Sequence, residues 1–136
     1  MPVLIDTDVA IELMRHSPYA LDCVSRHDDS IYVSSVTVAE LYFGAYNSAR
    51  PNENVAKIRG FLENFPRVTI TDEVAERFGR IKAELRRRSV QIAPFDLMIA
   101  SIALENDFRL ATGNTKHFAA LMELQTEDWV RSTRRP

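Results

Sequence analysis

The chain has 136 residues, 46% of them hydrophobic and 26% charged, and its formal net charge is -2 at pH 7. This length holds one hydrophobic core and excludes two, so we expect a single domain over residues 1–136. The charge gives no overall attraction to phosphates, and no apolar run approaches the roughly 20 residues of a membrane span. The lone Cys23 suits a reducing compartment, which favours a cytoplasmic protein without membrane contact.

Short apolar runs alternate with stretches of helical spacing along the chain. Apolar and β-branched runs predict strands at 3–5, 31–36, 67–70 and 109–112, with a weaker candidate at 122–128. Apolar residues at helical spacing predict helices near 9–14, 18–26, 37–46, 55–65, 74–85, 96–104 and 114–121. This alternation favours a three-layer α/β/α sandwich around a parallel sheet of four to five strands. The basic tail at 131–136 is expected to be disordered.

Four polar side chains come close after the predicted strands or open the helices between them. In chain order they are Asp6, Glu40, Asp96 and Asn114. Sites in parallel α/β sheets form outside the carboxyl ends of the strands, so we expect all four to face one crevice.

Helix capping offers a simpler explanation for most of these positions. Asp96 and Asn114 are good N-cap residues, and Glu40 fits a capping box that begins at Thr37. Asp8 is the expected cap of the first helix, which leaves the strand-end carboxylate just before it without a capping role. Taken singly, capping is the better explanation for Glu40, Asp96 and Asn114, but it does not explain the set.

Three carboxylates gathered at one sheet edge repel one another unless a cation lies between them. Asp6, Glu40 and Asp96 are hard oxygen ligands without a nearby histidine or cysteine pattern, a set that suits Mg²⁺ or Mn²⁺ rather than zinc. Such a metal can activate water and stabilise a leaving oxygen, which is the chemistry of phosphodiester hydrolysis.

Four segments carry a family resemblance. LIDTDVAIEL, SSVTVAELYFGA, IAPFDLMIASIAL and LATGNTKHF, in that order, resemble the PIN-domain ribonucleases, in particular the VapC-like toxins of type II toxin–antitoxin pairs. The similarity runs from about residue 3 to 129. It implies a Mg²⁺-dependent endoribonuclease on a parallel α/β/α sandwich, usually dimeric and held inactive by a cognate antitoxin.

The resemblance also implies residue roles. The family's first three acids, which bind metal and carry catalysis, fall on Asp6, Glu40 and Asp96, and its fourth catalytic position falls on Asn114. Many relatives have an aspartate at that fourth position, so a second metal would be held weakly here. Asp8 stands where asparagine is frequent, and its extra charge is expected to compensate in part for Asn114.

Several other residues were assigned by position. Lys116 is the better candidate for phosphate contact, whereas Arg86, Arg87 and Arg88 suit a solvated helix end. The histidines share no metal-ligand spacing and are interpreted as surface or structural residues: His16, His27 and His117. Three aromatic residues are expected in the core or a subunit contact, and secondarily in base stacking or antitoxin binding: Tyr42, Phe43 and Tyr46.

Two other functions compete with a nuclease. A strand-end Asp-x-Asp also begins phosphatases of the haloacid-dehalogenase type, but these need a later Asp-Asp pair, and the pair here, Asp28-Asp29, precedes the second strand. The other alternative is a scaffold that binds RNA or a partner without catalysis, which the neutral Asn114 favours and the three retained carboxylates oppose.

Overall fold

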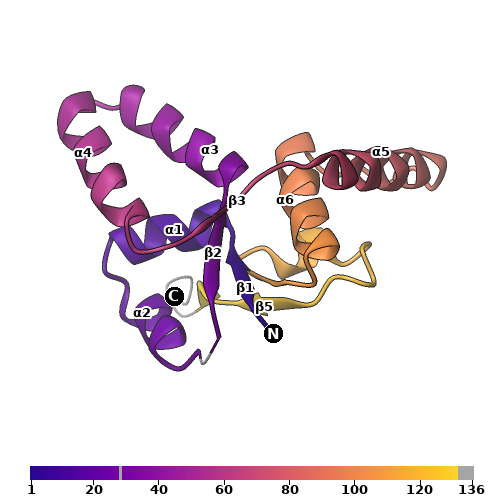
Figure 1. The fold of residues 1–136 in the computed structure, drawn as a ribbon, viewed down its shortest axis with the longest axis horizontal. Coiled ribbons are helices and arrows are strands. Elements are labelled where there is room, and N and C mark those ends of the chain that lie inside the picture. Colours follow the sequence, from indigo (N-terminus) through magenta and orange to yellow (C-terminus); the bar gives the residue numbers. More distant parts are fainter. Residues whose placement is uncertain (28, 132–136) are drawn as a thin grey trace.

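Five parallel strands form the central sheet of the computed structural model, which describes residues 1–27 and 29–131 (Figure 1). The strands are β1 (Val3–Ile5), β2 (Ile31–Ser34), β3 (Arg67–Val68), β4 (Arg109–Thr112) and β5 (Thr126–Asp128). The helices are α1 (Thr7–Met14), α2 (Pro18–Ser25), α3 (Ser35–Tyr46), α4 (Pro51–Leu62), α5 (Asp72–Arg87), α6 (Pro94–Glu105) and the 3₁₀ helix η1 (Thr115–Phe118). The predicted α/β fold is confirmed, with five strands.

The strand order is β3-β2-β1-β4-β5, so the first strand lies at the centre of the sheet. Ile5 of β1 is in register with Val33 of β2 on one side and Ala111 of β4 on the other. All pairs are parallel, so the carboxyl ends of the strands share one edge of the sheet. The residues that follow β1, β2 and β4 are thereby brought together although they are distant in sequence.

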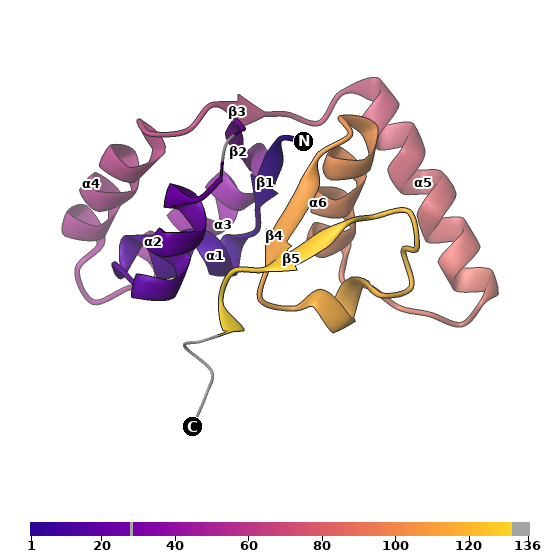
Figure 2. The ribbon, with the colours of Figure 1, turned by 90° about the horizontal axis from the view of Figure 1, so that it is seen from below.

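Helices cover both faces of the sheet, as Figure 2 shows with α1, α2 and α4 on one side and α5 and α6 on the other. Alternate residues of β1 enter the two layers: Val3 and Ile5 pack with the α1, α2 and α4 side, and Leu4 packs with the α5 and α6 side. All three side chains are fully buried. The predicted three-layer arrangement is therefore present.

Several element boundaries differ from the prediction, and at α3 the reason is that Ser34 caps the helix in place of Thr37. The Ser34 hydroxyl accepts a hydrogen bond from the Thr37 amide at 3.1 Å, so α3 begins at Ser35 and β2 ends two residues early. The sixth helix begins with Pro94 at its first position, two residues before Asp96. The strands β3 and β5 are shorter than expected, and η1 replaces a longer predicted helix.

The expected caps on the carboxylates are wrong, since Asp96 lies in the first turn of α6 and not at its N-cap, whereas Asn114 is the N-cap residue of η1 as expected. Asp6, rather than Asp8, is the N-cap of α1, because its carboxylate accepts from the Thr7 amide at 2.8 Å. Glu40 lies beyond the first turn of α3 and closes no capping box, since Ser34 is the cap. The capping explanation therefore fails for Glu40. It holds instead for Asp6, which was not expected to cap a helix.

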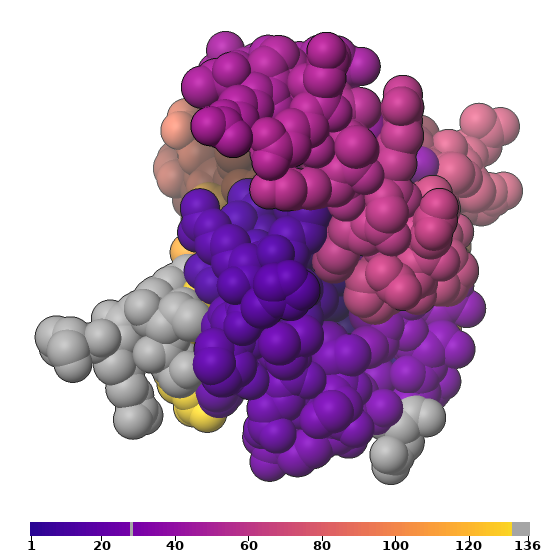
Figure 3. Space-filling model, turned by 90° about the vertical axis from the view of Figure 1, so that its left-hand side faces the viewer, coloured from indigo at the N-terminus to yellow at the C-terminus, as the bar shows by residue number. Residues whose placement is uncertain are grey.

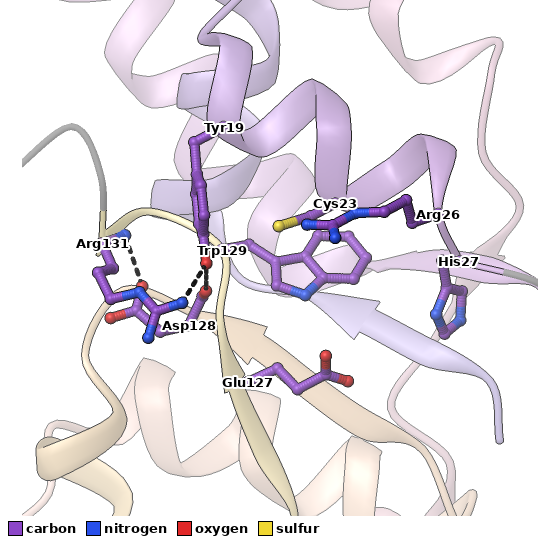
Figure 4. Close-up of a pocket in the computed structure, with 8 residues that line it drawn as sticks. All are labelled: Tyr19, Cys23, Arg26, His27, Glu127, Asp128, Trp129 and Arg131. Carbon is purple, nitrogen blue, oxygen red and sulfur yellow. Dashed lines mark hydrogen bonds between the residues drawn. The ribbon is translucent and has the colours of Figure 1, made fainter.

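Two hollows lie on the side of the sheet that α1 and α2 cover. A groove of about 1150 Å³ separates the helix pair α1 and α2 from the helix pair α3 and α4, on the face seen in Figure 3. A smaller, polar cavity of about 450 Å³ lies between α2 and the end of β5, lined by Tyr19, Arg131 and others shown in Figure 4. Trp129, which is 2% exposed, closes the sheet edge beside it, and Cys23 is only partly buried.

The rest of the C-terminal tail, with Arg134 and Arg135, lies outside the described residues. In residues 1–27 and 29–131, no helix has the length and apolar character needed to cross a membrane.

Candidate active site

Each of the four predicted site residues occupies a different element near the carboxyl edge of the sheet. Asp6 follows β1 directly, Glu40 lies in α3, Asp96 lies in the first turn of α6, and Asn114 precedes η1. The connections after β1, β2 and β4 supply three of them, as the parallel topology requires. Hydrogen bonds through Thr7 and Thr112 connect Asp6 with Glu40 and Asn114, whereas Asp96 is bound to His117.

Asp6 is the buried centre of the site, with 5% of its surface exposed. Its Oδ1 accepts from the Thr7 amide and its Oδ2 from the Thr112 hydroxyl, both at 2.8 Å. Burial, with the charges of Asp8 and, more weakly, Asp96, raises the pKa of Asp6 from 3.8 to about 6. Two other carboxylates are therefore close enough to oppose its ionisation, which is the situation in which a cation is most favourable.

Glu40 reaches this centre through a threonine that the sequence analysis did not single out. The Thr7 hydroxyl donates to Glu40 Oε1 at 2.6 Å and lies 3.0 Å from the Thr37 hydroxyl. Thr7 also follows Asp6 in the chain and donates its amide to that carboxylate. One residue thus contacts the first two predicted metal ligands.

Asp96 has a different partner. Its Oδ2 lies 3.1 Å from Nε2 of His117, which the sequence analysis interpreted as a surface or structural residue. Both side chains are about one-third exposed, at 34% for Asp96 and 38% for His117. The two residues are 21 positions apart, and no local spacing signals the pair.

Asn114 and Asp8 lie on the β4 side of the same edge. The backbone amide of Asn114 donates to the Thr112 hydroxyl at 3.1 Å, and the same hydroxyl donates to the Asp6 carboxylate. Asp8 accepts from the Gly113 amide at 2.9 Å. Asp8 is thus hydrogen-bonded to Gly113, the residue before Asn114. That the negative charge of Asp8 compensates in part for the neutral side chain of Asn114 stays a prediction.

The donor set fits a hard divalent cation. In the described part of the chain, no three His, Cys, Asp or Glu side chains converge closely enough to hold an ion as they stand. Mg²⁺, however, keeps several waters and commonly uses one or two carboxylates together with substrate phosphates. Asp6 and Asp96, which interact electrostatically, can supply those two carboxylates, with Glu40 held nearby by Thr7.

The basic candidates remain at the periphery. Lys116 lies in η1 next to His117, exposed at the same edge as Asn114. Arg86 and Arg87 end α5, and Arg88 is its C-cap, where positive charge complements the helix dipole.

Comparison with known proteins identifies the family of this chain. The family model of the PIN domain matches residues 3–123. Ribonuclease VapC2 of Haemophilus influenzae is 35% identical over 130 residues, which cover 93% of this chain and 97% of that protein. The tRNA(fMet)-specific endonuclease VapC of Shigella flexneri is 33% identical over 127 residues, covering 93% and 96%. The DNA-bound VapBC structure from Salmonella typhimurium superposes with a TM-score of 0.88 at 28% identity, covering 95% and 98%.

The chain therefore belongs to the PIN domain family, whose α/β fold it shares. Within that family it is a VapC-like protein, as the sequence resemblance indicated. The match spans the first strand to η1 and opposes the dehalogenase-type alternative.

Proposed function

We propose that this protein is a metal-dependent endoribonuclease, the toxin of a toxin–antitoxin pair, built as one domain over residues 1–136. Asp6, Glu40 and Asp96 are its metal-binding and catalytic carboxylates, and Asn114 takes the fourth catalytic position. The observation that carries the assignment is the buried Asp6, whose pKa is raised to about 6 beside the charges of Asp8 and Asp96. A carboxylate so crowded is stabilised in its charged form by a cation, here Mg²⁺ or Mn²⁺.

The chain's own residues arrange the reaction. Thr112 and the Thr7 amide hold the two oxygens of Asp6, and the Thr7 hydroxyl holds Glu40, so both carboxylates are oriented before substrate arrives. When bound, a divalent cation supplies an activated water and charge stabilisation for cleavage of the RNA phosphodiester bond. Asn114 adds a neutral oxygen, and exposed Lys116 beside it is placed to contact a phosphate of the RNA.

The groove supports an antitoxin partner. The VapBC structure from Salmonella typhimurium is bound to DNA. A second similar structure, VapBC-1 from nontypeable Haemophilus influenzae, superposes on this chain with a TM-score of 0.87 at 27% identity. In this chain the groove is lined largely by apolar residues of α1 to α4, and Glu40 lies in its wall. An antitoxin segment in the groove would thus reach a metal-binding carboxylate. This interaction occurs in the cytoplasm, where the lone Cys23 stays reduced.

We also propose a homodimer. Phe43 and Tyr46 on α3 are 70% and 63% exposed, which is unusual for large apolar side chains and typical of a contact surface.

The test is cleavage of a total RNA pool by the purified, antitoxin-free protein in Mg²⁺ or Mn²⁺, with mapping of the new RNA ends. We expect cleavage by the parent and none by Asp6→Asn, Glu40→Gln or Asp96→Asn. Glu76→Gln removes a carboxylate whose side chain is 83% exposed on α5, and it should cleave normally. A parent protein without metal-dependent cleavage would favour the scaffold alternative, and an active Asp96→Asn would overturn the site assignment.

A further inference from the structure

The third carboxylate of the proposed site differs from the others in how it is held. Asp6 and Glu40 are oriented by threonines, whereas the hydrogen-bond partner of Asp96 among the described residues is the imidazole of His117, at 3.1 Å. An ionised carboxylate can only accept, so Nε2 carries the proton of this hydrogen bond. The bond engages Oδ2 and leaves Oδ1, which has no hydrogen-bond partner in residues 1–27 and 29–131, to face another ligand.

The position of the imidazole is set independently of Asp96. The His117 amide donates to the Asn114 carbonyl at 2.9 Å, which closes the turn of η1. Its ring packs edge-on against Phe118, with ring centroids 5.3 Å apart, and Phe118 is 1% exposed. The backbone and the core therefore anchor His117 from one side, while its Nε2 points to Asp96 on the neighbouring helix α6.

This contact contributes little to folding. Both partners are about one-third exposed, and ion pairs or hydrogen bonds at such positions add little to stability because water screens them. The value of the contact therefore lies in orientation. Carboxylates that bind metals are commonly fixed by a second hydrogen bond, and loss of that bond weakens metal affinity by about 10- to 100-fold.

We propose that His117 is a positioning residue of the metal site, which orients the Asp96 carboxylate for the divalent cation through the Nε2–H to Oδ2 hydrogen bond. This proposal rests on the proposed function, because it needs Asp96 to be a metal ligand. His117 itself contacts neither substrate nor metal.

The experiment measures Mn²⁺ affinity of the antitoxin-free protein by calorimetry, with thermal unfolding as the control for folding. His117→Ala should weaken Mn²⁺ binding about tenfold, the lower end of the range for lost outer hydrogen bonds, because the pair is partly exposed. His117→Gln can place an amide N–H close to the position of Nε2 and should restore most of the affinity. His117→Asn carries the same group on a shorter chain and should not.

A double-mutant cycle tests whether His117 acts through Asp96. In the Asp96→Asn background, His117→Ala should cause no further loss of Mn²⁺ affinity. His16→Asn removes an exposed histidine outside the site, in a left-handed conformation that asparagine tolerates, and should leave the affinity unchanged.

The outcomes separate the two proposals. If the parent binds Mn²⁺ and Asp96→Asn weakens it while His117→Ala does not, the positioning role is wrong and the nuclease site stands. Equal losses in His117→Gln and His117→Ala would also overturn the role, because the restored donor would then be irrelevant. If Asp96→Asn leaves Mn²⁺ binding intact, both the proposed site and this inference are wrong.

Discussion

Asp6 combines two tasks that conflict energetically. It caps α1, which favours the charged carboxylate at the positive end of the helix dipole, yet burial and two neighbouring carboxylates oppose that charge. The opposing effects prevail, since the pKa is raised to about 6. The folded protein without metal therefore carries a charge that disfavours folding at neutral pH.

This conflict predicts a pH-dependent effect of Asp6→Asn on the metal-free protein. Between pH 3.8 and about 6 the folded parent holds a proton that the unfolded chain has released, so its stability falls as the pH rises through that window. The asparagine side chain of the variant does not ionise, so the variant does not lose stability in this pH range, and asparagine can still cap the helix. We expect Asp6→Asn to be more stable than the parent by on the order of 2 kcal/mol at neutral pH.

Urea unfolding in the presence of a chelator, repeated across the pH range, would measure this difference. The advantage of Asp6→Asn should shrink towards acid pH, where both proteins carry a neutral side chain at this position. Added Mg²⁺ should stabilise the parent and leave the variant unaffected. If the variant is less stable than the parent at neutral pH, the hydrogen bonds of the charged Asp6 carboxylate stabilise the fold by more than burial of its charge destabilises it.

Thr7 offers a second prediction for a single side chain. Thr7→Val keeps the shape of the residue and removes the hydroxyl that donates to Glu40. We expect RNA cleavage to fall about tenfold, because Glu40 loses the contact that orients it. Thr7→Ser keeps the hydroxyl and should cleave close to the parent rate in the same RNA-cleavage assay. Equal activity of the valine and serine variants would mean that Glu40 does not depend on Thr7.

At the scale of elements, the alternation of strands and helices was predictable, and Pro18 correctly marked the start of α2, but the start of α3 was not predictable. Ser34, Ser35 and Thr37 are all acceptable N-caps, and local sequence does not rank them. The fold selects Ser34, which leaves the Thr37 hydroxyl free to contact Thr7 of another helix. A contact between distant segments thus decides a local boundary.

The start of α3 can be tested through its cap. Ser34→Ala removes the oxygen that accepts from the Thr37 amide in a fully buried position. The free energy of unfolding should fall by about 1 kcal/mol, as for other N-cap substitutions, in chemical denaturation. Thr71→Ala, at the more exposed cap of α5, provides a comparison with no link to the site. If Thr71→Ala lowers the free energy of unfolding and Ser34→Ala does not, a residue other than Ser34 caps α3.

The candidate site was predictable where residues follow strands and not where long-range packing completes it. Asp6, Glu40, Asp96 and Asn114 were predicted from their positions after strands and near helix starts, and the family resemblance implied the same four residues. His117 carries no such signal, because its distance from Asp96 depends on how η1 packs against α6. Thr7 was equally hidden, since a threonine after a strand is common and its hydroxyl partners lie in α3.

At the scale of the whole molecule, the groove and the proposed active site share a wall at Glu40. A partner bound between the helix pairs is therefore able to alter the orientation of this carboxylate without occupying the whole site. If the antitoxin binds in the groove as proposed, this arrangement would connect its binding to inhibition through Glu40.

Leu21 allows the groove to be tested without disturbing the fold. It lines the groove and is 42% exposed, so Leu21→Glu places a charge in an apolar contact surface and not in the core. We expect antitoxin affinity to fall about tenfold, while RNA cleavage by the free protein is retained. Met122→Glu makes the same change at a side chain that is 91% exposed outside the groove. Equal antitoxin binding by both variants in calorimetry would place the antitoxin on another surface.

The pairing of β1 with β4 has a consequence for when the protein becomes active. Asp6 leaves the ribosome first, but Thr112, which holds it, arrives only with the strand that pairs beside it, more than 100 positions later along the chain. A nascent chain therefore cannot form this hydrogen bond, or the arrangement of Asp6 that depends on it, until β4 has been synthesised.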